Sequence, residues 1–176
     1  MDKRKEKNEE VRGAIIDAFF RLMRKRNNTE ITVSDIVREA GVARVSYYRN
    51  FSSREDIVNS LIDDVIERYE NVVDDSAGTF YCYWNVMMAF RMIHDYREYI
   101  RDILRYGFVL PLHERLNELH ERMDGDIPAS SLERYRIYAY IGAFTNTALE
   151  WVKEGSKESV EEIAQEFCRL VGIPIE

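Results

Sequence analysis

Cysteine, proline and glycine are scarce in this chain, with two, three and eight of its 176 residues. The two cysteines, Cys82 and Cys168, form no CxxC motif, so neither a disulfide framework nor a cysteine metal site is predicted. No apolar run approaches the ~20 residues that a membrane-spanning helix needs. The first ten residues are charged and lack the apolar stretch of a signal peptide. These absences predict a cytoplasmic protein with free thiols.

The residues that are abundant predict an all-α protein. Hydrophobic residues make up 45% of the chain and charged residues 32%, which is a globular composition. Apolar residues recur at helical spacing, and capping residues and glycines divide this pattern into about nine helices. The expected helices span residues 7–26, 33–40, 44–49, 53–73, 79–95, 97–106, 109–123, 131–154 and 160–171.

Four of these helices have a capping box at their start. In this motif a Ser or Thr accepts a hydrogen bond from the backbone N–H three residues on, and an acidic side chain there bonds back to the cap. The four pairs are Thr32 with Asp35, Ser52 with Glu55, Ser130 with Glu133 and Ser159 with Glu162.

The net charge of −7 is unevenly distributed along the chain. Residues 1–55 hold 13 Lys and Arg against 9 Asp and Glu, so they carry +4 and residues 56–176 carry −11. A protein that is acidic overall does not coat nucleic acid with its whole surface. A basic head on an acidic body is expected where only one end meets DNA.

Residues 32–51 combine two short helices with a tight turn at Gly41, the arrangement of a helix-turn-helix motif. The second helix, residues 44–49 (RVSYYR), carries two guanidiniums, one hydroxyl and two phenols. Arginine bonds guanine bidentately, whereas hydroxyls and phenols bond phosphate oxygens. The alternative for this pattern alone is a plain helical corner with solvated arginines.

The segment from Thr32 to Leu61 resembles the DNA-binding domain of TetR-family transcriptional regulators. In that family a Thr precedes the second helix, Ala-Gly-Val forms the turn, and an aromatic-Tyr pair lies on the third helix. Ala43 stands where the family usually has Ser, which predicts a third helix without a side-chain cap. The matching residues here are Thr32, Ala40-Gly41-Val42, Tyr47-Tyr48, Phe51 and Arg54-Glu55.

The resemblance implies a DNA-binding domain at residues 1–52 and a ligand-sensing and dimerisation domain at residues 53–176. It implies a homodimeric regulator, most often a repressor, on a palindromic double-stranded DNA operator, modulated by a small molecule of unknown identity. The alternative from a different class is a helical small-molecule or protein-binding module that has lost DNA binding.

The resemblance also implies particular DNA contacts. Phe51 is expected in the core. Lys3, Arg4, Lys5 and Lys7 form either a basic arm against DNA or a solvated, frayed end. The expected phosphate contacts are Thr32, Ser46, Tyr48 and Arg54, the expected base-facing residues are Arg44, Val45 and Tyr47, and Arg49 is a further DNA contact.

The helix at 131–154 is apolar on nearly every side between Ile137 and Val152. A surface helix needs only one apolar stripe, so we expect its own domain to cover one side and a second subunit the other. The helix at 160–171 is apolar on one face. A homodimer through these two helices is predicted, and an ordinary buried pair in a monomer is the alternative.

Nine aromatic residues fall between residues 78 and 108, with methionines among them. They predict a cavity for a flat or apolar molecule, although each aromatic alone is also compatible with a plain core. The candidate ligand-binding residues are Tyr83, Trp84, Met88, Tyr106, Phe144 and Asn146.

Signals for enzymatic or metal chemistry are weak. His113 and His120 share a helical face, but a solvated face is the favoured interpretation over a metal site. The sequence has no Gly-rich phosphate loop, nucleophile elbow or Glu-x-x-His pair. Neither an enzyme, a metal nor a cofactor is therefore predicted.

Overall fold

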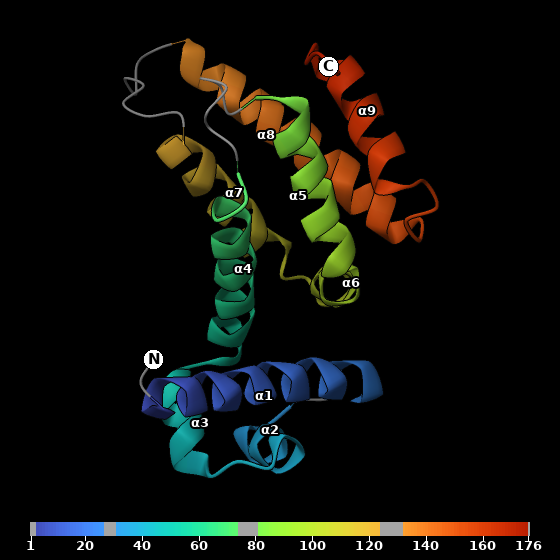
Figure 1. The fold of residues 1–176 in the computed structure, drawn as a ribbon. Helices are drawn as coiled ribbons and strands as arrows, with labels where there is room; N and C mark the ends of the chain where they lie inside the picture. Colours follow the sequence, from blue (N-terminus) through green and yellow to red (C-terminus); the bar gives the residue numbers. More distant parts are fainter. Residues whose placement is uncertain (1–2, 27–30, 74–80, 124–131, 176) are drawn as a thin grey trace. The chain divides into compact units, whose positions relative to one another are not determined.

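The computed structural model describes residues 3–26, 31–73, 81–123 and 132–175 (Figure 1). In these residues the all-α prediction is confirmed, with nine helices and no strand. None of the described helices has the length and apolar character needed to cross a membrane. The helices are α1 (Lys3–Arg26), α2 (Val33–Ala40), α3 (Arg44–Asn50), α4 (Arg54–Glu70), α5 (Tyr83–Asp95), α6 (Arg97–Tyr106), α7 (Val109–Met123), α8 (Glu133–Lys153) and α9 (Val160–Val171).

The packing of the chain divides it into two compact units. The first unit comprises Met1–Leu61 with Asp102–Phe108, and the second comprises Ile62–Arg101 with Val109–Glu176. Helices α4 and α6 each continue from one unit into the other. The packing boundary therefore falls within α4, whereas the predicted domain boundary after residue 52 lies ahead of that helix.

In the first unit, α1 supplies the largest group of buried residues, and the end of α6 is bonded to it. The Arg24 Nε and Asp102 Oδ2 atoms are 2.6 Å apart, and the Tyr106 hydroxyl donates to the carbonyl of Met23. These contacts explain why residues 102–108 pack with the first unit. The buried residues of α1 are Ile15, Ile16, Ala18, Phe19, Phe20, Leu22 and Met23.

Helix α2 begins and ends as its sequence predicts. The Thr32 hydroxyl accepts from the Asp35 N–H at 3.2 Å, and the Asp35 carboxylate accepts from the Thr32 N–H at 3.1 Å. Gly41 ends the helix at φ 68°, in the left-handed region where a residue without a Cβ is favoured. The box predicted at Ser159 is confirmed in the same way at the start of α9.

The capping box predicted from Ser52 to Glu55 is wrong by one residue. The Ser53 hydroxyl accepts from the Asp56 N–H at 3.0 Å, and the Asp56 carboxylate accepts from the Ser52 N–H at 2.8 Å. Two serines followed by two acids satisfy the spacing in either register, and α4 begins at Arg54, which makes Asp56 the third helical residue. The predicted cap at Ser130 lies outside the described residues.

The core of the second unit is centred on Phe90 of α5. Its ring centroid lies 5.0 Å from that of Phe144, 5.8 Å from Trp151 and 5.9 Å from Phe167, which joins α5 to α8 and α9. The Trp151 indole N–H donates to the carbonyl of Glu158 at 3.2 Å, so its polar end is satisfied. Phe90, from the aromatic stretch noted in the sequence, and Phe144, a predicted ligand contact, are therefore core residues.

The two cysteines are free thiols in different environments. Cys168 of α9 is fully buried in this core, and burial raises the pKa of its thiol to about 11. Cys82, which precedes α5, is half-buried. Because the thiolate is the reactive form, burial and protonation both protect Cys168.

We expect the folded protein at pH 8 to show one accessible thiol toward an aromatic disulfide reagent, with the second titrated only after denaturation. The C82S variant should lose the accessible thiol and the C168S variant should keep it. Rapid reaction of Cys168 in the folded C82S variant would contradict this assignment.

Candidate nucleic-acid interface

Helix α3 is anchored by two buried aromatic side chains. Tyr47 is 1% exposed and Phe51 is 2% exposed, and their ring centroids are 6.1 Å apart. The Phe51 N–H donates to the Tyr47 carbonyl at 2.8 Å, which closes the last turn. As the sequence predicts, Ala43 at the N-cap provides no side-chain hydrogen bond. The helix is therefore held by packing rather than by its N-terminal cap.

The opposite face of α3 is presented to solvent. Val45 is 64% exposed and Tyr48 is 56% exposed, and Arg44 and Arg49 are exposed beside them. The Arg44 guanidinium lies 5.7 Å from the Tyr48 ring centroid and donates to its hydroxyl at 3.2 Å. This contact holds a guanidinium and a phenol side by side on the exposed face. Such a pair can bind an anion or the edge of a guanine.

The expectation that Tyr47 faces bases is wrong. Residues 44, 45, 48 and 49 share one side of the helix, and the 3.6-residue period turns Tyr47 to the other side, under Phe51. Burial also raises the pKa of its phenol. Tyr47 therefore belongs to the core that positions α3.

Two of the predicted phosphate contacts, Thr32 and Arg54, already bond within the chain through their side chains. Thr32 is exposed, but its hydroxyl and its N–H both bond the Asp35 carboxylate. Arg54 is half-buried and donates to the carbonyl of Ile31 at 3.5 Å, which ties the start of α4 to the residue before Thr32. Ser46 is half-buried, and its carbonyl accepts from the Asn50 side chain. Their contacts with DNA stay predictions.

A second candidate site is an apolar cavity of about 60 Å³ in the second unit. Of the six candidate ligand-binding residues, only Phe144 lines it. The sequence analysis looked for aromatic residues and did not predict the aliphatic lining residues of α4 and α7. The helical spacing of those residues indicates a core but not a cavity. The lining residues are Val65, Ile66 and Tyr69 of α4, Ala89, Met92 and Ile93 of α5, Leu116 and Leu119 of α7, and Tyr140 and Phe144 of α8.

The other five candidates lie elsewhere. Tyr106 packs in the first unit through its bond to Met23, described above. The Asn146 side chain is exposed and donates to the Gly142 carbonyl of its own helix at 2.9 Å. Trp84 is 49% exposed, and Tyr83 and Met88 are half-buried outside the cavity lining.

The polar atoms of the cavity wall come from two tyrosines. The Tyr69 hydroxyl donates to the carbonyl of Asn85 at 3.2 Å, and burial raises its pKa. Burial also raises the pKa of Tyr140 well above its ordinary value. Both phenols are neutral at physiological pH, so the described lining carries no charge and suits an uncharged, apolar molecule.

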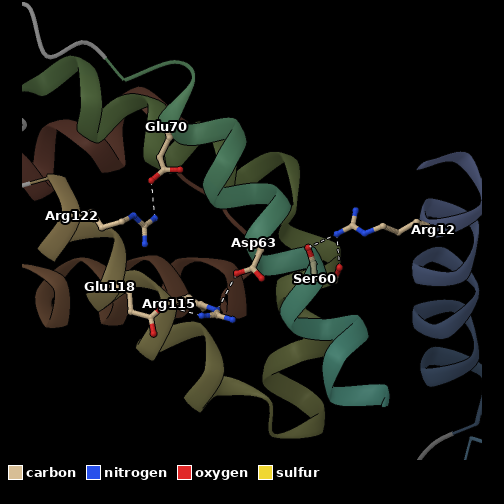
Figure 2. A network of polar contacts seen from close by, with 7 residues as sticks. All are labelled: Arg12, Ser60, Asp63, Glu70, Arg115, Glu118 and Arg122. Carbon is tan, nitrogen blue, oxygen red and sulfur yellow. Dashed lines mark hydrogen bonds and ion pairs between the residues drawn. The ribbon is translucent and has the colours of Figure 1, made fainter. Parts of the chain in front are cut away.

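Long arginine side chains of α7 reach α4 (Figure 2). The Arg115 Nε atom lies 3.0 Å from Asp63, and the Arg122 Nη2 atom lies 2.8 Å from Glu70. The two acids and the two arginines are each seven residues apart, so the pairs repeat along neighbouring faces of α4 and α7. Surface pairs of this kind contribute at most about 1 kcal/mol each.

The first-unit half of α4 is held by α1. The Arg12 guanidinium donates to both the carbonyl and the hydroxyl of Ser60. Figure 2 shows Arg12 and the α7 arginines reaching different stretches of the same helix. In the described residues, no group of three His, Cys, Asp or Glu side chains is placed to hold a metal.

Comparison with known proteins identifies likenesses along most of the chain. The family model "Bacterial regulatory proteins, tetR family" matches residues 15–61. The HTH-type transcriptional repressor KstR2 of Mycobacterium tuberculosis is 22% identical over 91% of this chain and 90% of its own length.

Two solved structures share the fold. NalD, the secondary repressor of the MexAB-OprM multidrug efflux pump in Pseudomonas aeruginosa, is 16% identical with a TM-score of 0.65, and the match covers 94% of this chain and 96% of that one. The dihydroxyacetone kinase operon activator DhaS is 19% identical with a TM-score of 0.63 over 92% and 93% of the two chains.

The two neighbouring tyrosines of α3 are expected to respond differently to substitution. Tyr47→Ala should lower the free energy of unfolding by about 3–5 kcal/mol, because it empties a buried aromatic site. Tyr48→Ala should change it by less than about 1 kcal/mol, because that ring is largely exposed. Denaturant unfolding of the two variants makes the comparison, and equal losses would contradict the burial assigned to Tyr47.

Proposed function

We propose that this chain, a member of the tetR family of bacterial regulatory proteins, is a repressor that binds a palindromic operator as a homodimer. The observation that carries the proposal is the outward face of α3, where Arg44, Val45, Tyr48 and Arg49 are exposed above buried Tyr47. Residues 1–52 bind DNA, and residues 53–176 sense a ligand and dimerise.

Each subunit inserts α3 into the major groove of one half-site. Arg44 bonds guanine bidentately, and Tyr48, already stacked against it, donates its hydroxyl to a phosphate. The half-site centres of a helix-turn-helix dimer lie about 34–36 Å apart, or a multiple of that distance. The relative KstR2 is named a transcriptional repressor, which supports the role of repressor for this chain. DhaS is named an operon activator, so proteins with this fold also include activators.

The dimer contact is assigned to α8 and α9. Tyr135 of α8 is 69% exposed and Leu170 of α9 is 71% exposed, and large side chains of this kind favour a partner surface. Ala139 of α8 is also exposed and small enough to permit close approach. A second copy of these helices covers both faces in a closed, two-fold arrangement.

The effector is an uncharged, apolar small molecule that enters the cavity lined by α4, α5, α7 and α8. The described cavity of about 60 Å³ is smaller than most ligands, so binding widens it and displaces α4. Because α4 begins next to the DNA-binding helices and lines the cavity farther along, its displacement changes the spacing of the two α3 helices. Effective release requires the ligand to favour the DNA-free state by a few kcal/mol.

Selection of genomic DNA fragments on the purified protein at about 150 mM salt tests the proposed DNA binding. We expect one or a few palindromes to be enriched, and the Y48A variant to lose this enrichment while keeping its fold. Absence of binding to any duplex, even at low salt, would contradict the proposal. That result would favour the alternative, a helical ligand- or protein-binding module.

Fluorescence of the neutral probe N-phenyl-1-naphthylamine tests the proposed effector site. Ala89→Leu places extra carbon in the cavity and should weaken probe binding at least about tenfold, equivalent to about 1.4 kcal/mol. Ala43→Leu makes the same chemical change at an exposed position of the first unit, outside the cavity lining, and should leave probe binding unchanged. Equal effects of the two variants, or tighter binding of a fatty-acid anion than of the neutral probe, would contradict this assignment.

A further inference from the structure

The first turns of α1 and the outer side of α3 line an open hollow of about 440 Å³ in the first unit. Arg4, Lys5 and Lys7 line it from α1, and Arg49 lines it from α3 beside Ser46. Figure 1 shows the N-terminal end of α1 lying next to α3. Lys3, Arg4, Lys5 and Lys7 all lie within α1, so the structure shows helix where a frayed end was the alternative, and their contact with DNA stays a prediction.

A pair of asparagine side chains joins the two walls of this hollow. The Asn8 amide donates to the Asn50 side-chain oxygen at 3.0 Å, which links α1 to the last residue of α3. The Asn50 amide in turn donates to the Ser46 carbonyl at 2.8 Å and to the Asn8 oxygen at 3.4 Å. These contacts are half-buried, so the cations of the two helices are presented at a fixed separation.

The electrostatics of the hollow differ from those at the other end of α1. There, Arg21 and Lys25 both pair with Glu39, at 3.3 Å and 2.8 Å. Within the part of the chain that the structure describes, Lys5 and Lys7 have no carboxylate partner, and the lining of the hollow includes no acid. The hollow therefore concentrates positive charge.

We infer that this hollow binds the phosphodiester backbone of DNA next to the base pairs that α3 contacts. The inference rests on the proposed function and adds a second contact surface to it. Arg49 belongs both to the exposed face of α3 and to the hollow, so one duplex is contacted by both surfaces. Because phosphates carry no sequence information, this contact strengthens binding to every duplex alike.

The test compares the full-length protein with the variant R4Q/K5Q/K7Q by fluorescence anisotropy on two duplexes, a selected site and an unrelated sequence. Each lost phosphate contact lowers the slope of log K against log salt by about 0.9. We expect the variant to lose about 2–3 in slope per subunit on both duplexes. The control variant K153Q/K157Q/R169Q removes the same charge from surface pairs of the second unit and should keep the wild-type slope.

A second variant, Asn8→Ala, leaves every cation in place but removes the side-chain bonds between α1 and Asn50 of α3. It should weaken binding to both duplexes without changing net charge, whereas a role for diffuse charge alone predicts no effect. Thermal unfolding checks that each variant remains folded. Competition by inorganic phosphate at matched ionic strength tests for a free anion as the ligand.

An unchanged slope for R4Q/K5Q/K7Q, on duplexes that the wild-type protein binds, would overturn the inference and leave the proposed function intact. If inorganic phosphate binds the wild-type protein but not R4Q/K5Q/K7Q, and the salt slope of DNA binding is the same for both proteins, the hollow is a site for a free anion and the inference is overturned. Failure of the wild-type protein to bind any duplex would overturn the inference and the proposed function together.

Discussion

Burial of Tyr47 and Phe51 is the contact on which the exposed face of α3, the proposed DNA contact, depends. The helix has only seven residues and no N-cap side chain, and a helix this short does not persist alone in water. Its two aromatics are four residues apart and therefore lie on one side, where the core holds them. The direction of the opposite, exposed face follows from that anchoring, so the packing of α3 determines what it presents to a partner.

Helix α4 carries the second constraint, because its two halves pack in different units. Arg12 holds Ser60 in the first unit, whereas Arg115 and Arg122 hold the acids farther along in the second. Exposed ion pairs are weak, so apolar packing around the cavity sets the position of this half of α4. A molecule that enters the cavity therefore changes the apolar packing, which stabilises this half of α4 more than the ion pairs do.

The sequence predicted the local features of this fold well because their causes are local. Helices α6 and α7 have the predicted bounds, and the boxes at Thr32 and Ser159 form as their spacing requires. The helical period alone places Tyr47, four residues before Phe51, on the same buried side of α3. The resemblance to a family pattern favoured a base-facing role instead. The box at Ser52 failed because two registers satisfied the same spacing.

The features that the sequence did not predict depend on residues far apart in the chain. The cavity takes its wall from four helices, and nothing local separates Val65 or Leu119 from ordinary core residues. The aromatic cluster around Phe90 filled the space where a ligand site was expected. The hydrogen bond between Asn8 and Asn50 joins residues 42 positions apart, and no local sequence pattern predicts it.

The uneven charge of the chain acquires a physical role once the cations are located. At physiological salt the Debye length is about 8 Å, so a duplex responds mainly to the charges that it touches. In the proposed complex, the cations of α1 and α3 therefore act on DNA almost independently of the net charge of −7. The acidic remainder of the chain adds no attraction of its own, which disfavours any other orientation on DNA. In the proposed complex, the cations that line the hollow strengthen binding through phosphate contacts, while the overall acidic charge limits unspecific adhesion.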